Sequence, residues 1–169
     1  MDDQIRIEPA RPEDAAAILE IHAAAVHQTA APYYPEEVIN SWARLPITGD
    51  QIERFGQRLI ENPDHRTVVA KQNNQIVGFG SIDDKNNELQ GLYVHPNFGR
   101  CGVGAKILAV LEQEALLLGL SYLRLDASLN AEVFYSQQGF EVVEYGVHQL
   151  ASGQEMACVK MRKTLALKC

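Results

Sequence analysis

The sequence predicts an α/β fold in which helices flank both faces of a mixed, mostly antiparallel sheet of about seven strands. Two observations carry this prediction. Short segments rich in β-branched and aromatic residues recur along the chain, and two of the intervals between them are Asn-Asn turns. Longer segments carry apolar residues at helical spacing. Alternation of these two patterns is typical of a layered α/β domain.

The first third of the chain predicts one strand followed by helices. Residues 5–9 alternate apolar and polar side chains, as a strand with one buried face does. Pro12 opens a helix whose apolar face includes Ile18, and two acidic residues favour its first turn. Prolines and a glycine then separate two shorter helices, one starting at Pro35 and one over 51–61.

The rest of the chain predicts a three-stranded meander and then alternating helices and strands. Turns formed by Asn-Asn pairs separate the first three strands, and a glycine-rich loop after Pro96 leads into the longest helix. The expected strands span 67–70, 75–82, 88–94, 121–126, 140–145 and 155–162, and the expected helices span about 102–118 and 130–138.

Composition and charge narrow the classes of partner. The chain has 169 residues, which we take as a single domain over 1–169, and its formal net charge is -7. An acidic surface lacks the basic footprint of nucleic-acid binding and attracts a cationic substrate such as an amine. We therefore expect a small-molecule or protein amine as partner and no nucleic acid, and we allow for a homodimer.

The cysteines and the lack of a long apolar run in the sequence indicate a cytoplasmic protein. Cys101, Cys158 and Cys169 are odd in number and match no zinc spacing, so we expect no metal site and a reducing compartment. The N-terminal residues are acidic and form no apolar run, which argues against a secretion signal. No segment approaches the ~20 apolar residues of a membrane span, so we expect no membrane association.

The glycine-rich loop is a candidate phosphate site. Gly102-Val103-Gly104 precedes a helix, where free backbone N–H groups and the helix dipole attract anions. A Walker A loop does not fit, because Lys106 comes one place late and no hydroxyl follows. A dinucleotide loop does not fit either, because Ile107 stands where its third glycine belongs. A turn without a ligand is the alternative.

The segments around this loop carry two motifs of one known family. Residues 92–96 are Leu-Tyr-Val-His-Pro and lead into the Gly-x-Gly loop, and residues 130–140 contain Asn-Ala-x-x-Phe-Tyr-x-x-x-Gly-Phe. Together they resemble the GNAT superfamily of acyl-CoA-dependent transferases. The resemblance implies an N-acetyltransferase that moves an acetyl group from acetyl-CoA to a primary amine by direct attack in a ternary complex. The alternative is a non-catalytic acyl-CoA-binding or sensor module with the same fold.

The resemblance also implies a cofactor site. In this family backbone groups of the loop hold the pyrophosphate, and the strand before the loop pairs with the pantetheine arm. Gly99 stands where a Gln or Arg is usual, which the backbone mode of binding tolerates. The implied cofactor-binding residues are Leu92, Tyr93, Val94, Arg100, Cys101, Gly102, Val103, Gly104, Ala105 and Asn130.

Three chemical roles follow for an acetyl transfer. We expect Tyr135 to protonate the leaving thiolate, since a phenol of pKa ~10 can protonate a thiolate of pKa about 8.5; the alternative is a packing ring whose hydroxyl caps a backbone group. For the base we expect Glu88, where the histone-acetyltransferase branch of the family carries its base, with His95 or water as alternatives. The N–H of Val94 is the candidate oxyanion donor.

The N-terminal helices are the expected acceptor region. The resemblance places the acceptor pocket over about 28–62, where no motif names the acceptor. We expect Trp42 to be a core residue at helical spacing, and we leave Tyr33 and Tyr34 open between packing and acceptor contact.

Overall fold

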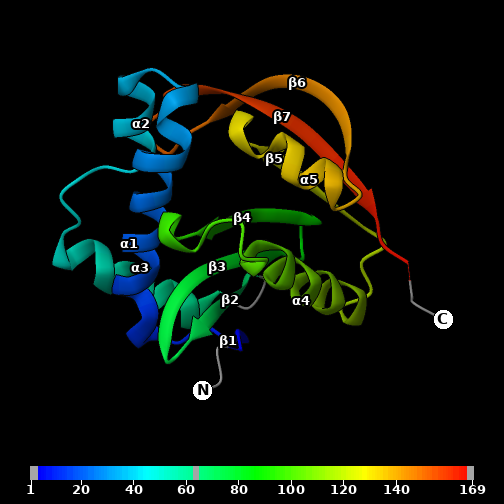
Figure 1. The fold of residues 1–169 in the computed structure, drawn as a ribbon, viewed down its shortest axis with the longest axis horizontal. Helices are drawn as coiled ribbons and strands as arrows, with labels where there is room; N and C mark the ends of the chain where they lie inside the picture. The colour runs from blue at the N-terminus through cyan, green and yellow to red at the C-terminus, as the bar shows by residue number, and fades with distance from the viewer. Residues whose placement is uncertain (1–3, 63–64, 167–169) are drawn as a thin grey trace.

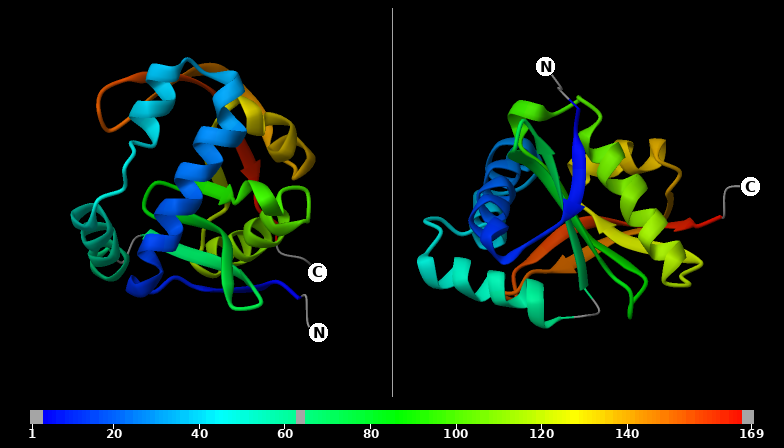
Figure 2. Two further views of the ribbon diagram at one scale, coloured as in Figure 1. Left: turned by 60° about the vertical axis from the view of Figure 1, so that its left-hand side comes forward. Right: turned by 90° about the horizontal axis from the view of Figure 1, so that it is seen from below.

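The structure is a computed structural model that describes residues 4–62 and 65–166. Its described strands form one seven-stranded sheet, with helices on both faces (Figure 1, Figure 2). The strands are β1 (Arg6–Pro9), β2 (His65–Gln72), β3 (Gln75–Asp83), β4 (Glu88–Val94), β5 (Tyr122–Ala127), β6 (Glu141–Gln149) and β7 (Glu155–Thr164).

The helices alternate with these strands as the sequence predicts. The main helices are α1 (Ala15–Ala24), α2 (Glu36–Trp42), α3 (Gly49–Glu61), α4 (Val103–Leu117) and α5 (Glu132–Gln137). Short turns extend them: η1 (Pro12–Asp14), the π-helical η2 (Ala25–Ala30), η3 (Ala31–Tyr33), η4 (Pro96–Phe98) and η5 (Leu129–Ala131). In the described part of the chain, no helix is both long and apolar enough to cross a membrane.

The sheet has the order β1-β2-β3-β4-β5-β7-β6. Its neighbouring strands pair antiparallel, except that β4 and β5 run parallel. The predicted class, a mixed and mostly antiparallel sheet with flanking helices, is confirmed.

Alternate residues of β2 show how the two faces are covered. Val68 and Ala70 join the core under α4, whereas Val69 packs with Ile18 of α1 on the opposite face. Because strand side chains alternate in direction, one strand serves both layers. The sheet is therefore an interior layer between α4 on one side and α1 with α3 on the other (Figure 2).

Glycines on β3 bring α4 close to the sheet. A Cβ built on Gly80 would lie 2.9 Å from both Ile107 Cγ2 and Leu111 Cδ1, and 3.2 Å from the backbone oxygen of Gly91. No real side chain fits there without displacing α4. The close approach fixes the helix whose first turn carries the glycine-rich loop.

Replacing Gly80 by valine is therefore expected to lower the free energy of unfolding by about 1–3 kcal/mol through overpacking. For a chain of this length that corresponds to a fall in Tm of roughly 2–4 °C per kcal/mol. Gly49→Val is the matched control, because a Cβ at Gly49 meets no atom within 4 Å. Equal Tm values for the two variants would contradict the close packing of α4 on β3.

The parallel strands β4 and β5 stay together only at their beginning. Among the described residues one register pair, Glu88 with Arg124, joins them, and the two parts of the sheet then diverge (Figure 1). On its other side β4 pairs with β3 and carries one extra residue, Gln90, between the pairs of Leu89 and Gly91. The bulge and the divergence leave the β5-facing edge of β4 without a strand partner beyond this point.

Candidate active site

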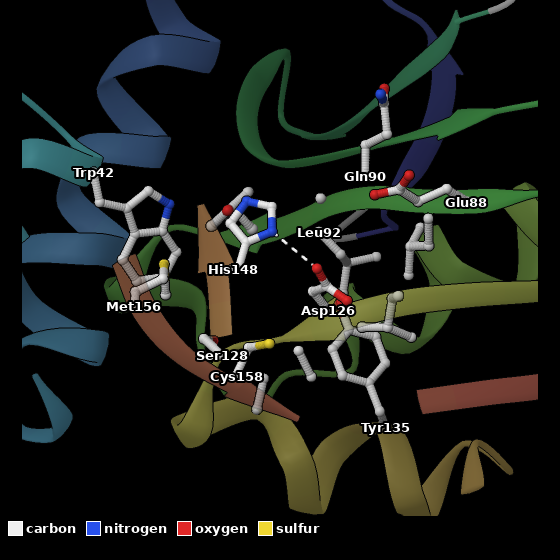
Figure 3. Close-up of a pocket in the computed structure, with 16 residues that line it drawn as sticks. Trp42, Glu88, Gln90, Leu92, Asp126, Ser128, Tyr135, His148, Met156 and Cys158 are labelled. Atoms are coloured by element: carbon white, nitrogen blue, oxygen red, sulfur yellow. Dashed lines mark hydrogen bonds and ion pairs between the residues drawn. The ribbon is translucent and has the colours of Figure 1, made fainter. Parts of the chain in front are cut away.

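A pocket opens where β4 and β5 diverge. Residues of β4, β5, α2, α5, β6 and β7 line it, so strands and helices far apart in sequence meet there (Figure 3). Its side chains with polar or reactive atoms include Glu88, Asp126, Ser128, Tyr135, His148 and Cys158.

The N-terminus of α4 forms an anion cradle. Gly102 is its N-cap at φ 79°, a left-handed conformation that favours glycine, and the preceding Arg100 has φ 62°. Lys106 N–H donates to the Gly102 carbonyl at 3.1 Å and so begins the helical bonding pattern. The N–H groups of the residues before Lys106 in this first turn have no intrahelical acceptor, which suits a pyrophosphate.

The open edge of β4 offers further backbone groups. His95 N–H donates to Val77 O at 2.9 Å, so His95 points its N–H toward β3. In an antiparallel pair the next residues alternate, and Val94 and Leu92 therefore direct their N–H and C=O groups the other way, toward β5. With no β5 pairing at this level, these groups can pair with an extended ligand that carries amides.

Asn130, on η5, carries a buried acceptor without a donor in the described part of the chain. Its side-chain oxygen Oδ1 is buried and has no hydrogen-bond partner among the described residues. A buried acceptor of this kind is costly unless a donor reaches it. A ligand that brings an N–H group to this oxygen would satisfy it, although Asn130 is not among the residues that line the pocket.

Tyr135, on α5, lines the pocket, and its ring packs among other aromatic rings. It is 4% exposed and packs edge-on against Phe134 and Phe140, at 5.1 and 5.5 Å between ring centroids. Its hydroxyl makes no hydrogen bond to a backbone group in the described part of the chain, so the capping role finds no support. Burial, with a smaller effect of Tyr93, raises the pKa of Tyr135 far above its usual value. The phenol is therefore protonated at neutral pH and is a weaker acid than the free phenol that the sequence-based expectation assumed.

The candidate bases named from the sequence lie in different places. Glu88 lines the pocket, and its carboxylate Oε2 pairs with Arg124 Nη2 at 3.4 Å. The ring nitrogen Nδ1 of His95 accepts the N–H of Asn97 at 3.1 Å, so His95 caps the η4 turn. His95 is not among the residues that line the pocket described here.

A charged cluster that the sequence analysis did not identify lies in the same pocket. His148 Nδ1 is 2.9 Å from Asp126 Oδ2, and Lys160 Nζ is 3.2 Å from Asp126 Oδ1. Burial favours the protonated form of Asp126, but the bonds from His148 and Lys160 outweigh it and lower the pKa of Asp126. The carboxyl therefore remains ionised beside the imidazole.

Aromatic side chains join the N-terminal helices to the pocket. Trp42 lines it and packs edge-on against Tyr93, at 6.3 Å between ring centroids, so Trp42 is both a packing and a lining residue. Tyr34 donates to Ala157 O at 2.6 Å and accepts from Leu129 N–H at 2.9 Å, which ties η3 to β7 and η5. Tyr33 is 55% exposed and lies outside this network.

A buried histidine completes the aromatic cluster. His22 packs edge-on against Tyr93 at 4.7 Å between ring centroids. Burial, with a smaller effect of His27, lowers the pKa of His22 to about 4, so the ring is neutral near pH 7. Within the described residues, no group of three or more His, Cys, Asp or Glu side chains is arranged to hold a metal ion.

The sequence model of the acetyltransferase (GNAT) domain matches residues 29–165. This chain belongs to the GNAT acetyltransferase family. As a GNAT protein it is an acyltransferase that uses acetyl-CoA as its cosubstrate, and the α4 cradle with the open edge of β4 is the part of the structure that fits that cosubstrate.

Relatives agree with this assignment. The chain is 29% identical to the uncharacterized N-acetyltransferase YafP of Escherichia coli (strain K12) over 142 residues, which cover 84% of this chain and 85% of YafP. A solved GCN5-related N-acetyltransferase of Rhodopseudomonas palustris, named aminotransferase class-II, has 31% identity and a TM-score of 0.83 over 95% of each chain.

A more distant structure shares the GNAT fold. The PaiA N-acetyltransferase of Thermoplasma acidophilum, solved in complex with coenzyme A, superposes with a TM-score of 0.75 at 23% identity. The match covers 95% of this chain and 99% of that one, so the similarity extends over the whole sheet and its helices.

Proposed function

We propose that this GNAT chain transfers the acetyl group of acetyl-CoA to a primary amine, of a small molecule or a protein, by direct attack in a ternary complex. The observation that carries the proposal is one pocket that joins a buried phenol to carboxylates and an imidazole, beside the open edge of β4. The carboxylates of Glu88 and Asp126, within a chain of net charge -7, favour an alkylammonium over an anionic acceptor.

Each part of the site has a chemical task in this proposal. The first turn of α4, from Gly102 to Ala105, binds the pyrophosphate, and Arg100 and Cys101 border it. The β5-facing groups of Leu92 and Val94 pair with the pantetheine arm beside Tyr93 and Asn130. The Val94 N–H then lies on the edge where it can stabilise the oxyanion of the tetrahedral intermediate.

The reaction needs one proton removed and one supplied. The amine nitrogen attacks the acetyl carbonyl carbon, and the carbon–sulfur bond then breaks. Tyr135 gives its phenolic proton to the departing thiolate and regains a proton from solvent. A base takes the proton that the nitrogen loses, and within the pocket the candidates are Glu88 and the pair formed by Asp126 and His148. The products are the amide and free CoA thiol.

The test is amine-dependent release of free thiol from acetyl-CoA. The panel contains an aliphatic diamine, an arylalkylamine, an aminoglycoside and a peptide with a free α-amino group. We expect at least one of these amines to raise the rate of thiol release at least tenfold over the rate in buffer alone. Mass spectrometry should find one added acetyl group on that amine. Tight acetyl-CoA binding with no acetylated product from any amine would instead favour the sensor alternative.

A further inference from the structure

We propose that His148, oriented by Asp126, is the base that takes the proton from the attacking amine. This inference rests on the proposed acetyl transfer to an amine, and it assigns the step that family resemblance gives to Glu88. It places the base on β6, an outer strand, rather than on β4.

The geometry fixes the imidazole in a basic form. With Nδ1 at 2.9 Å from a carboxylate oxygen, the proton of the neutral ring lies on Nδ1, and the lone pair lies on Nε2. Nε2 has no hydrogen-bond partner among the described residues. Figure 3 shows His148 between Trp42 and Leu92, with Asp126 on one side of the ring. The free nitrogen is thus available to a ligand in the pocket.

The pair joins strands β5 and β6, which β7 separates in the sheet. Asp126 of β5 lies opposite Lys160 of β7, and His148 of β6 lies opposite Met156 of β7. The Asp126 side chain is 19% exposed and that of His148 is 42% exposed. Asp126 is therefore held between two cationic or donor groups, while His148 keeps one edge accessible to an incoming amine.

The carboxylate of Asp126 lies directly beside the imidazole. Lys160 from β7 binds the Asp126 carboxylate, Glu88 from β4 and Cys158 from β7 line the same pocket, and Glu144 from β6 lies near Cys158 and Lys160. Asp126 stays ionised because its bonds to His148 and Lys160 outweigh burial, which lowers its pKa. A fixed carboxylate stabilises the imidazolium that forms when His148 takes a proton.

Glu88 is less suited to this step. Its carboxylate lies at the end of the pocket where β4 and β5 still pair, and the Arg124 guanidinium engages it at 3.4 Å. A Glu88 oxygen is thus already engaged by a donor, whereas Nε2 of His148 is not engaged by any described residue. In the structure, His148 is a base held by a second residue and left with a free lone pair.

The proton transfers balance in four steps. The neutral amine attacks the acetyl carbon, and the N–H proton of the resulting intermediate passes to Nε2 of His148. The carbon–sulfur bond breaks, and the thiolate takes the phenolic proton of Tyr135. The imidazolium then releases its proton to solvent, and the phenolate takes one from solvent. Amine and acetyl-CoA thus become amide and free thiol.

The test compares single-turnover rates between about pH 5 and 9 for the best amine of the panel, with acetyl-CoA saturating. His148→Gln is expected to lower the rate about 10²-fold at neutral pH. It should also remove the imidazole's part of the acid limb and leave only the part that protonation of the amine causes. Added imidazole should restore part of the rate to His148→Ala. Asp126→Asn should lower the rate and move the acid limb to lower pH, because the imidazolium loses its carboxylate.

His65→Gln is the matched control, since His65 pairs with Asp83 at 3.5 Å and is not among the residues that line the pocket. It should keep the rate and the acid limb of the wild type. An active wild type whose rate and whole acid limb are unchanged in His148→Gln but changed in Glu88→Gln would overturn the assignment and leave the proposed function intact. A wild type that acetylates no amine overturns both. Acetyl-CoA binding and Tm, measured for every variant, separate misfolding from loss of the base.

Discussion

The variant Tyr135→Phe should transfer acetyl groups roughly 10²–10⁴-fold more slowly than the wild type in a single turnover. The change removes only the hydroxyl, and with it the proton that we assign to the leaving thiolate. Acetyl-CoA affinity should stay nearly constant, because the ring keeps its contacts with Phe134 and Phe140. Rapid mixing with the best amine of the panel measures the rate without interference from product release.

Two further measurements sharpen this test. The Tyr135 hydroxyl has no partner among the described residues, so its loss should change the free energy of unfolding by less than about 1 kcal/mol. Because the pKa of Tyr135 is raised, this phenol should contribute no alkaline limb to the wild-type profile up to about pH 10. Tyr145→Phe is the control, since Tyr145 is 67% exposed and donates to Glu132 on the surface. A Tyr135→Phe rate equal to that of the wild type would exclude Tyr135 as the acid.

The variant Gly104→Asp should bind acetyl-CoA at least about 100-fold more weakly, a loss of about 2.7 kcal/mol. A Cβ at Gly104 lies 3.3 Å from Phe134 Cζ and 3.5 Å from Leu92 Cδ2. The aspartate side chain therefore enters the space between the first turn of α4 and the open edge of β4. The added carboxylate also repels the pyrophosphate at the helix N-terminus.

Calorimetry and thermal unfolding measure this effect. The wild type should gain about 2.7 kcal/mol of stability when acetyl-CoA exceeds its Kd a hundredfold, and the variant should lose most of that gain. Gly104→Ala adds the Cβ without the carboxylate, so its affinity for acetyl-CoA separates the effect of crowding from the effect of charge. Gly49→Asp places the same residue in the first turn of α3, where a Cβ meets no atom within 4 Å, and should bind acetyl-CoA normally. Unchanged affinity in Gly104→Asp would move the phosphate site elsewhere.

Local patterns predicted the elements that carry the cofactor site. The expected strand over 88–94 is β4 to the residue, and the helix expected over about 102–118 is α4 within one residue at each end. The alternation of apolar and polar residues, the Asn-Asn turns and the glycine N-cap each depend on a few neighbouring residues. A single segment of sequence is therefore enough to predict each of them. Two residues were also predicted to belong to the site: Tyr135, within the motif over 130–140, and Glu88, at the start of β4. Both line the pocket.

Features set by distant partners were not predictable in this way. β6 extends to Gln149 rather than 145, because residues 147–149 pair with β7. The helix expected over 130–138 is instead η5 followed by α5, which turns the Asn130 side chain inward. Asp126 and His148 lie 22 residues apart in sequence, on strands β5 and β6 that both pair with β7. Their contact depends on how these three strands come together in the folded chain. No spacing rule within a single segment signals such a pair.

The position of the open edge of β4 has a consequence for aggregation. An unpaired strand edge at the rim of a sheet can recruit a strand from another molecule, and proteins must protect it. Here the unpaired edge lies in the interior of the sheet order, with β5 beyond it and the Glu88–Arg124 pair closing one end. An edge enclosed in this way is less accessible to a strand of another molecule than an edge at the rim. We therefore expect the open edge of β4 to stay free for the extended, amide-bearing arm of the cosubstrate that we propose binds there, and not to promote intermolecular sheet formation.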